Sequence, residues 1–176
     1  MREVIIGADG FIGNHLAKHL PDAVKTTRRF SNQIGDWPFD LVEKGPLPEA
    51  DIVYICAGVN GTLNCARDPQ GTFRINVDGT IYVAEHYKDS HVVWISSTTV
   101  EWCQEAYAVQ KRTTETVLRQ MPHVGIVRAG RVINQNVDSL CETLINMGRS
   151  RLHGIVIWGE DEVPYDHGKA ILKAVV

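Results

Sequence analysis

A tyrosine and a lysine four residues apart, Tyr107 and Lys111, are the clearest pair of chemically useful side chains in the sequence. On a helix this spacing puts both side chains on one face. A tyrosine with a pKa of about 10 is mostly neutral at pH 7, and a neighbouring ammonium group favours the phenolate and lowers that pKa. The phenolate can act as a general base on a hydroxyl, or the phenol as a general acid on a carbonyl. The same spacing is common on surface helices, so the pair needs support from other residues.

A glycine-rich loop near the N-terminus forms a second candidate site. The apolar run 3–6 leads into Gly7-Ala8-Asp9-Gly10-Phe11-Ile12-Gly13, and residues 11–20 have helical spacing up to Pro21. Glycines allow a tight turn in which backbone N–H groups approach a pyrophosphate at a helix N-terminus. The pattern is G-x-x-G-x-x-G, because alanine stands at position 8 where G-x-G-x-x-G requires glycine. It predicts a dinucleotide phosphate site, with an ordinary turn as the alternative, and the lack of G-K-[ST] excludes a P-loop.

β-rich apolar runs and amphipathic stretches alternate along the chain. We expect further strands at 23–27, 51–57, 91–96, 124–128 and 154–158, and helices at 69–87, 107–120, 137–147 and 167–175. The alternation predicts an α/β fold, namely a Rossmann-type doubly wound parallel sheet with helices on both faces. The length of 176 residues suits a single domain over residues 1–176. Ligands of such sheets bind beyond the carboxyl ends of the strands.

The composition argues against several classes of partner. Eighteen basic and twenty-one acidic residues give a net charge of −3, which disfavours nucleic acid and membrane surfaces. No apolar run reaches the ~20 residues that span a bilayer. The four cysteines form no C-x-x-C pair, and His15 and His19 lack an adjacent glutamate and a third ligand. We therefore expect a cytoplasmic protein with reduced thiols and no metal site.

Six segments, in order along the chain, resemble motifs of the extended short-chain dehydrogenase/reductases, a family of NAD(P)-dependent nucleotide-sugar epimerases, dehydratases and reductases. They are the glycine loop 7–13, the strand and Ala-Gly turn 51–58, the Asn-Val-x-Gly-Thr segment 76–80, the strand 92–100 that ends at the catalytic Ser or Thr, the Tyr-x-x-x-Lys motif 107–111 and the strand end 127–130. The resemblance covers residues 1–132 and is weaker at 164–174.

The resemblance implies a catalytic site of Ser97, Tyr107 and Lys111. Counting back three residues from Val100 selects Ser97, with Ser96 as the alternative. Ser97 would hold the substrate oxygen on which Tyr107 acts, and Lys111 would also bind the nicotinamide ribose. An oxidised nicotinamide would join the ammonium in favouring the phenolate of Tyr107. The dehydratases of the family often carry Asp-Glu directly after the catalytic residue, where this chain has Thr98-Thr99, which favours epimerisation or reduction.

The residues expected to bind the cofactor come from the glycine loop, the ends of the early strands and the catalytic helix. They are Gly7, Gly10, Phe11, Ile12, Gly13, Thr27, Arg28, Arg29, Asp40, Ala57, Gly58 and Lys111. Asp40 is the adenine contact that the resemblance implies, and a solvent-facing loop aspartate is the alternative. A fold that selects NAD places an acidic residue at the end of its second strand, whereas here that strand is followed by Arg28-Arg29. Arginine suits a 2′-phosphate, so we predict NADP in preference to NAD, unless both arginines are merely solvated.

Two departures from the family concern its substrate side. Only nine residues separate Ser97 from Tyr107, and only forty-five follow Arg131. We therefore expect residues from about 131 to form a shortened substrate-side portion, with either a smaller substrate or a pocket completed by another subunit. Arg128 and Arg131 could contact a substrate phosphate or form structural ion pairs.

These observations favour an NAD(P)-dependent oxidoreductase or epimerase acting on a sugar-type alcohol or carbonyl, with a nucleotide sugar as the expected substrate. The alternatives are a non-catalytic NAD(P)-binding sensor or regulatory protein and an α/β domain for another phosphate ligand. The resemblance also implies a homodimer paired through the helices at 69–87 and 107–120. Candidate apolar contacts of that pairing are Tyr82, Val83 and Leu118, and burial in the core of the monomer is the alternative for each of them.

Overall fold

The computed structural model describes residues 1–28, 36–159 and 173–175. The strands form one sheet in the order β3-β2-β1-β4-β5-β6-β7-β8, in which β1 to β7 run parallel and β8 is antiparallel to β7. The strands are β1 (Glu3–Ile6), β2 (Val24–Thr27), β3 (Asp36–Pro38), β4 (Ile52–Ile55), β5 (His91–Ser97), β6 (Val124–Ala129), β7 (Gly154–Trp158) and β8 (Lys173–Val175). The helices are α1 (Phe11–His19), α2 (Thr62–Arg67), α3 (Pro69–Phe73), the π-helical η1 (Arg74–Gly79), α4 (Thr80–His86), the 3₁₀ turn η2 (Thr98–Glu101), α5 (Ala106–Leu118) and α6 (Val137–Arg149).

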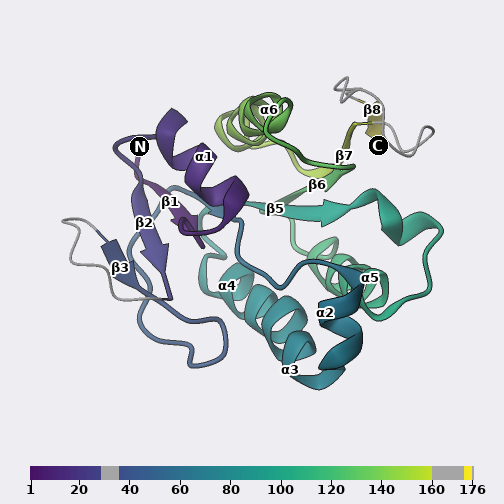
Figure 1. Ribbon diagram of the computed structural model, residues 1–176. Helices are drawn as coiled ribbons and strands as arrows, with labels where there is room; N and C mark the ends of the chain where they lie inside the picture. Colours follow the sequence, from purple (N-terminus) through teal and green to yellow (C-terminus); the bar gives the residue numbers. More distant parts are fainter. Residues whose placement is uncertain (29–35, 160–172, 176) are drawn as a thin grey trace.

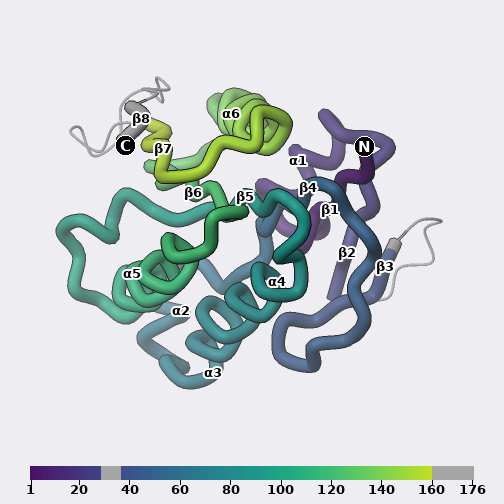
Figure 2. Tube along the Cα trace, turned by 180° about the vertical axis from the view of Figure 1, so that it is seen from behind, coloured from purple at the N-terminus to yellow at the C-terminus, as the bar shows by residue number. Residues whose placement is uncertain are grey.

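Helices cover both faces of the sheet. Figure 1 shows α1 and α6 on one face and α2 to α5 on the other, and Figure 2 shows the same two layers from behind. This arrangement confirms the predicted Rossmann-type, doubly wound fold. The strand order reverses between β1 and β4, and a crevice at that point of the carboxyl edge is where such sheets bind ligands. Within the described ranges, no helix has the length and apolar character needed to cross a bilayer.

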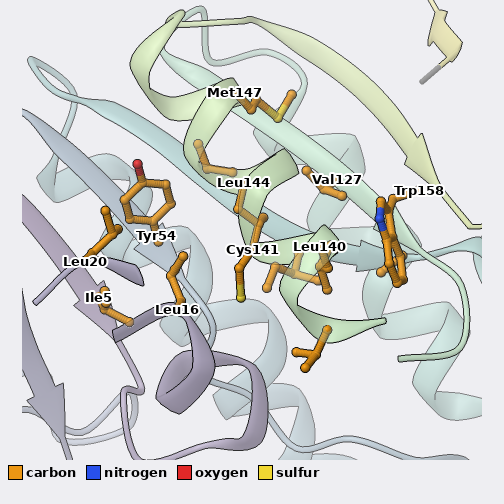
Figure 3. Packing of buried hydrophobic residues seen from close by; sticks show 14 of the residues in the cluster. Ile5, Leu16, Leu20, Tyr54, Val127, Leu140, Cys141, Leu144, Met147 and Trp158 are labelled. Carbon is orange, nitrogen blue, oxygen red and sulfur yellow. The ribbon is translucent and has the colours of Figure 1, made fainter. Parts of the chain in front are cut away.

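The central strands are apolar on both faces because both faces are covered. Ile5 and Tyr54 pack with α1 and α6 in one core cluster (Figure 3), whereas Val4 and Val53 pack with α4 and α5 in a second. Neighbouring residues of one strand thus serve opposite helical layers. The same clusters correct one expectation: Val83 and Leu118 are fully buried in the second core and are not surface contacts for a dimer.

The structure differs from the prediction at three elements, α2, β3 and β8. Helix α2 and strand β3 were not expected, since neither has a run long enough to show periodicity. Residues 173–175 form β8 rather than the end of the helix expected at 167–175, and residues 167–172 lie outside the described part. The pairing of β8 covers the outer edge of β7, where backbone groups of an edge strand otherwise lack partners.

His91 opens β5 at the edge of the sheet opposite the crevice. Its side chain is buried, and its Nε2 has no hydrogen-bond partner among the described residues. Burial is the main cause that lowers the pKa of His91 to about 4, and the positive charges of Arg151, His123 and His153 contribute to the same shift. The folded protein therefore resists protonation at this ring.

We predict that His91 makes the protein less stable in mild acid. Because the pKa of an unfolded histidine is near 6.5, its contribution is complete above that pH and is lost as the pH falls from about 6.5 to about 4, with a slope of up to ~1.4 kcal/mol per pH unit. Chemical denaturation at several pH values measures this slope. His91→Leu should flatten it over that interval, and an unchanged slope in the variant would contradict the assignment.

Candidate functional site

The turn after β1 requires two of its glycines. Gly7 has φ of +84°, and a Cβ there would lie 2.7 Å from the Cα of Ala57. A Cβ on Gly13 would overlap the carbonyl oxygen of Gly7. The N–H groups of Gly7 and Ala8 donate to the carbonyl oxygen of Thr26 at 3.2 and 2.9 Å. The glycines thus let β1, β4 and α1 approach one another more closely than any side chain would allow.

The N-terminus of helix α1 has no side-chain cap. Its capping residue is Gly10, no side chain caps the helix, and its first turn contains no acidic residue. The first N–H groups of a helix have no partner within the helix, and they carry partial positive charge. The end of α1 can therefore receive a phosphate.

A cavity of about 480 Å³ lies along the carboxyl edge of the sheet. Its wall includes most of the predicted site, and these residues are Gly7, Gly10, Phe11, Ile12, Arg28, Asp40, Ala57, Gly58, Ser97, Tyr107 and Lys111. Gly13 and Thr27 lie outside the wall, and Arg29 lies outside the described residues. Lining residues that the sequence analysis did not select include Asp9, Cys56, Val59, Asn60, Ile95 and Val132. The proposed phosphate loop and the proposed catalytic residues thus share one cavity.

The wall at the end of β2 and β3 combines a cation with a carboxylate. Arg28 is exposed and directly follows β2. The Asp40 carboxylate accepts hydrogen bonds from the N–H groups of Val42 (2.7 Å) and Glu43 (3.2 Å). One oxygen of Asp40 is therefore used within its own turn.

Lys111 is a buried cation in the cavity wall. Its Nζ donates to the carbonyl oxygen of Ile95 at 2.7 Å and lies 4.6 Å from the ring centroid of Trp94. Burial lowers the pKa of Lys111 to about 8, while the nearby carboxylate of Glu115 opposes that shift. The ammonium form is thus held by a carbonyl, an aromatic face and a carboxylate.

The pKa of Tyr107 is raised in the protein without cofactor. Lys111 Nζ lies 5.7 Å from the centroid of the Tyr107 ring, yet burial raises the pKa of this phenol to about 12. The negative charge of Cys65 in its thiolate form contributes to this rise, and an interaction with Ser97 acts in the lowering direction. In the protein alone, removal from water is the main cause of the shift, so Tyr107 is a neutral phenol at pH 7.

The adjacent serines Ser96 and Ser97 have different hydrogen-bond partners, and both line the cavity. The Ser96 hydroxyl donates to the carboxylate of Glu115 at 2.5 Å. The Ser97 oxygen instead accepts from the N–H of Thr99 at 3.3 Å and is bonded to the Thr99 hydroxyl at 2.9 Å. The two candidates for the catalytic serine therefore differ in their partners: Ser96 is bonded to a buried carboxylate, and Ser97 is bonded to Thr99.

Arg128 forms structural ion pairs, one of the two alternatives considered for it. Its guanidinium donates to both oxygens of Glu115, at 2.7 to 3.2 Å, and to Glu101 at 2.8 Å. Glu115 is almost fully buried on α5, and Glu101 belongs to η2. Arg128 thus connects the turn after Ser97 to the helix of Tyr107. The role of Arg131 stays a prediction.

A buried amide cluster beneath the loop after β4 was not predicted. The Asn76 side chain accepts from the N–H of Val59 at 2.8 Å and donates to its carbonyl at 3.0 Å. Asn76 also donates to Gln110 at 2.8 Å, and Gln110 donates to Thr72 at 2.9 Å. The sequence offered one indication of this cluster, which is the position of Gln110 between Tyr107 and Lys111. The cluster holds the loop after β4 against α5, the helix that carries Tyr107 and Lys111.

His15 and His19 of α1 lie close to the carboxylate of Asp138 on α6. His19 and His15 lie 3.0 and 3.5 Å from one carboxylate oxygen of Asp138, which connects α1 to α6. Among the described residues, no group of three or more His, Cys, Asp or Glu side chains could hold a metal ion.

A comparison with protein families identifies the relationship. The model of the NAD dependent epimerase/dehydratase family matches residues 4–170. The chain belongs to this family. No curated protein matches the sequence.

Several solved structures share the fold of this chain. A hypothetical dTDP-4-dehydrorhamnose reductase from Sulfolobus tokodaii is 19% identical with a TM-score of 0.73, over 91% of this chain and 77% of that one. A UDP-N-acetylglucosamine 4-epimerase from Methanobrevibacter ruminantium M1, in complex with UDP-N-acetylmuramic acid, is 15% identical with a TM-score of 0.76, over 89% and 75%. RMD from Pseudomonas aeruginosa, complexed with NADPH, is 24% identical with a TM-score of 0.59, over 74% and 54%.

We predict that Arg128 is needed chiefly as the partner of Glu115. Arg128→Met leaves a buried carboxylate without its bidentate partner, which should lower the free energy of unfolding by about 3–5 kcal/mol. Glu101→Gln removes an exposed pair to the same guanidinium and should cost less than about 1 kcal/mol. Urea denaturation measures both. Equal losses in the two variants would show that burial of Glu115 is not the cause.

Proposed function

We propose that this family member is an NAD(P)-dependent oxidoreductase or epimerase that acts on an alcohol or carbonyl of a nucleotide sugar. One observation carries the proposal: Ser97, Tyr107 and Lys111 line the same cavity as the glycine loop. A protein that only binds a dinucleotide has no need of a general acid–base residue there. The sensor alternative therefore has less support.

The loop residues fit a dinucleotide. A Cβ at position 7 or 13 would collide with backbone atoms, and the N-terminus of α1 has no side-chain cap. Gly7, Gly10 and the N–H groups that open α1 would hold the pyrophosphate, while Ala57 and Gly58 would line its other side. Lys111 would bind the nicotinamide ribose. When bound, the nicotinamide supplies the acceptor or donor of a hydride.

Tyr107 would exchange a proton with the substrate oxygen. As a phenol with a pKa of about 12, it is protonated at pH 7 and ready to donate to a carbonyl that is being reduced. In the reverse direction it must lose its proton, which positive charge nearby would favour. Lys111 supplies such charge, with its Nζ 5.7 Å from the phenol ring.

Ser97 is the better candidate for the catalytic serine. The Ser96 hydroxyl donates to the buried carboxylate of Glu115 at 2.5 Å, whereas Ser97 is bonded to the N–H and the hydroxyl of Thr99. Thr98 and Thr99 offer no carboxylate after this serine, so we infer epimerisation or reduction rather than dehydration.

The substrate side and the assembly are further parts of the proposal. We infer that residues 1–176 act as one domain in which residues from about 131 form a short substrate-side portion. A homodimer through α4 and α5 remains our proposal, with Tyr82, which is only partly buried against the second core, as the candidate contact. Sedimentation velocity at micromolar concentration distinguishes a dimer from the 19.6 kDa chain.

We predict that Tyr107→Phe removes turnover but not cofactor binding. Loss of the hydroxyl should lower kcat by roughly 10²-fold or more, because no other group on the described wall is placed to exchange this proton in our proposal. Turnover with UDP-N-acetylglucosamine or UDP-glucose, and NADPH binding by fluorescence, measure the two effects. Tyr82→Phe is the matched control on α4. Wild-type turnover in Tyr107→Phe would sink the mechanism, and binding without turnover in the wild type would favour the sensor.

We predict that Arg28 selects NADP. Arg28→Ala should weaken NADP binding by ~1–3 kcal/mol, the usual contribution of a hydrogen bond to a charged group, and leave NAD binding almost unchanged. Calorimetry with each dinucleotide measures the difference. Arg119→Ala, an exposed arginine at the end of α5 and away from the cavity wall, is the control. NAD binding as tight as NADP binding by the wild type would refute the preference without affecting the fold.

A further inference from the structure

The first turn of α5 carries Tyr107 and has no side-chain cap. The capping residue is Glu105, which has an extended backbone (φ −75°, ψ 161°) and whose side chain makes no capping hydrogen bond. The first bond of the helix runs from the Val109 N–H to the Glu105 carbonyl oxygen at 3.0 Å. The N–H groups before it have no partner within a helix, and helix ends fray. Tyr107 is the second residue of this turn.

Arg112, further along the same helix, holds the chain that enters α5. Its Nη1 donates to the carbonyl oxygens of Val100 at 2.8 Å and Cys103 at 2.6 Å, and its Nη2 donates to the side chain of Gln104 at 3.2 Å. A guanidinium only donates and a carbonyl only accepts, so the chemistry of the groups fixes the direction of the first two bonds. The guanidinium therefore ties three residues of the loop to the helix into which they lead.

The loop that Arg112 holds is itself closed by hydrogen bonds, and Figure 1 shows it between β5 and the start of α5. The N–H of Cys103 donates to the carbonyl oxygen of Thr99 at 2.9 Å. On the other side, Arg128 of β6 donates to the carboxylate of Glu101 at 2.8 Å. Because these bonds hold the loop in one shape, its attachment to Arg112 also fixes where α5 begins.

We propose that Arg112 is a positioning residue for Tyr107, which replaces the missing cap of α5 by tying the incoming loop to the second turn of the helix. The effect on catalysis rests on the proposed function, in which Tyr107 exchanges the proton. Arg112 is not part of the cavity wall, so it acts through the loop and the first turn. Its three acceptors are uncharged, so the planar fork of the guanidinium matters here rather than neutralisation of a charge.

This role separates proton transfer from cofactor binding. Fraying of the first turn would move Tyr107 but would not reach Lys111, which lies one turn later and whose Nζ donates to the carbonyl oxygen of Ile95 on β5. Loss of Arg112 should therefore lower kcat and leave the affinity for NADPH almost unchanged. A general loss of stability would affect both quantities.

Hydrogen exchange of single backbone amides, followed by NMR, tests the attachment without turnover. In Arg112→Met the N–H of Val109 should exchange roughly tenfold faster than in the parent protein, the size of effect that loss of a helix cap produces. The matched reference is the Asn14 N–H, which donates the first bond of the other uncapped helix, α1, to Gly10 at 2.8 Å. Its exchange should not change. Arg119→Met, at the exposed end of α5, is the control variant.

A new cap supplies the second test. Glu105→Ser places a preferred capping residue where the backbone is already extended. In the Arg112→Met background it should slow the exchange of Val109 to within about threefold of the parent and restore kcat in proportion, which a residue needed only for packing would not allow. Arg112→Lys keeps a cation without the planar fork and is the second variant should Arg112→Met fail to fold. It should accelerate the exchange by about threefold or more.

Any of four results would overturn the inference. Three concern exchange: an unchanged rate at Val109 in Arg112→Met, an equal acceleration at Asn14, or no slowing by Glu105→Ser. The fourth is faster exchange at Val109 with an unchanged kcat, since the first turn would then not need to be held. A parent protein without turnover on nucleotide sugars would instead reject the proposed function, and the exchange rates would still decide whether Arg112 holds the first turn.

Discussion

The burial of one positive charge, the ammonium of Lys111, constrains much of the site. Removing an ammonium group from water is costly unless other groups stabilise it. The carbonyl of Ile95 and the ring of Trp94 contact it directly, and Glu115 one helical turn later supplies a negative charge. Glu115 is itself buried, and it requires the bidentate guanidinium of Arg128 on β6. A lysine that a substrate or cofactor can use is thus retained as a cation by residues from two strands and one helix.

The shape of the cavity depends on close contact between backbones. At the point where the strand order reverses, Gly7 lies so near Ala57 that a side chain at position 7 would collide with it. This contact brings the first turn and the loop after β4 to opposite sides of one crevice. The Asn76 amide then holds Val59 by both its N–H and its carbonyl. Because Asn76 is also bonded to Gln110, the position of the loop is coupled to α5, the helix that carries Tyr107.

Charge and hydrogen-bond partners distinguish residues of the same type within this site. Ser96 donates to a buried carboxylate, while Ser97 is hydrogen-bonded to the N–H and the hydroxyl of Thr99. Tyr107 is kept neutral by burial even though a lysine is near. Tyr107 is therefore protonated in the protein alone, and additional positive charge in the cavity would favour its phenolate.

The amino-acid sequence was sufficient to predict the doubly wound sheet, the glycine turn and the candidate pair Tyr107 and Lys111. Periodicity, glycine stereochemistry and i, i+4 spacing are local properties, and local properties can be read along the chain. The partners of the two serines, the direction of the Tyr107 pKa shift and the partners of Arg128 were decided only in the tertiary structure. Each depends on burial and on side chains from other strands and helices. A hydroxyl, a phenol or a guanidinium acquires its role from the charges and dipoles that folding places around it, and sequence spacing does not specify those.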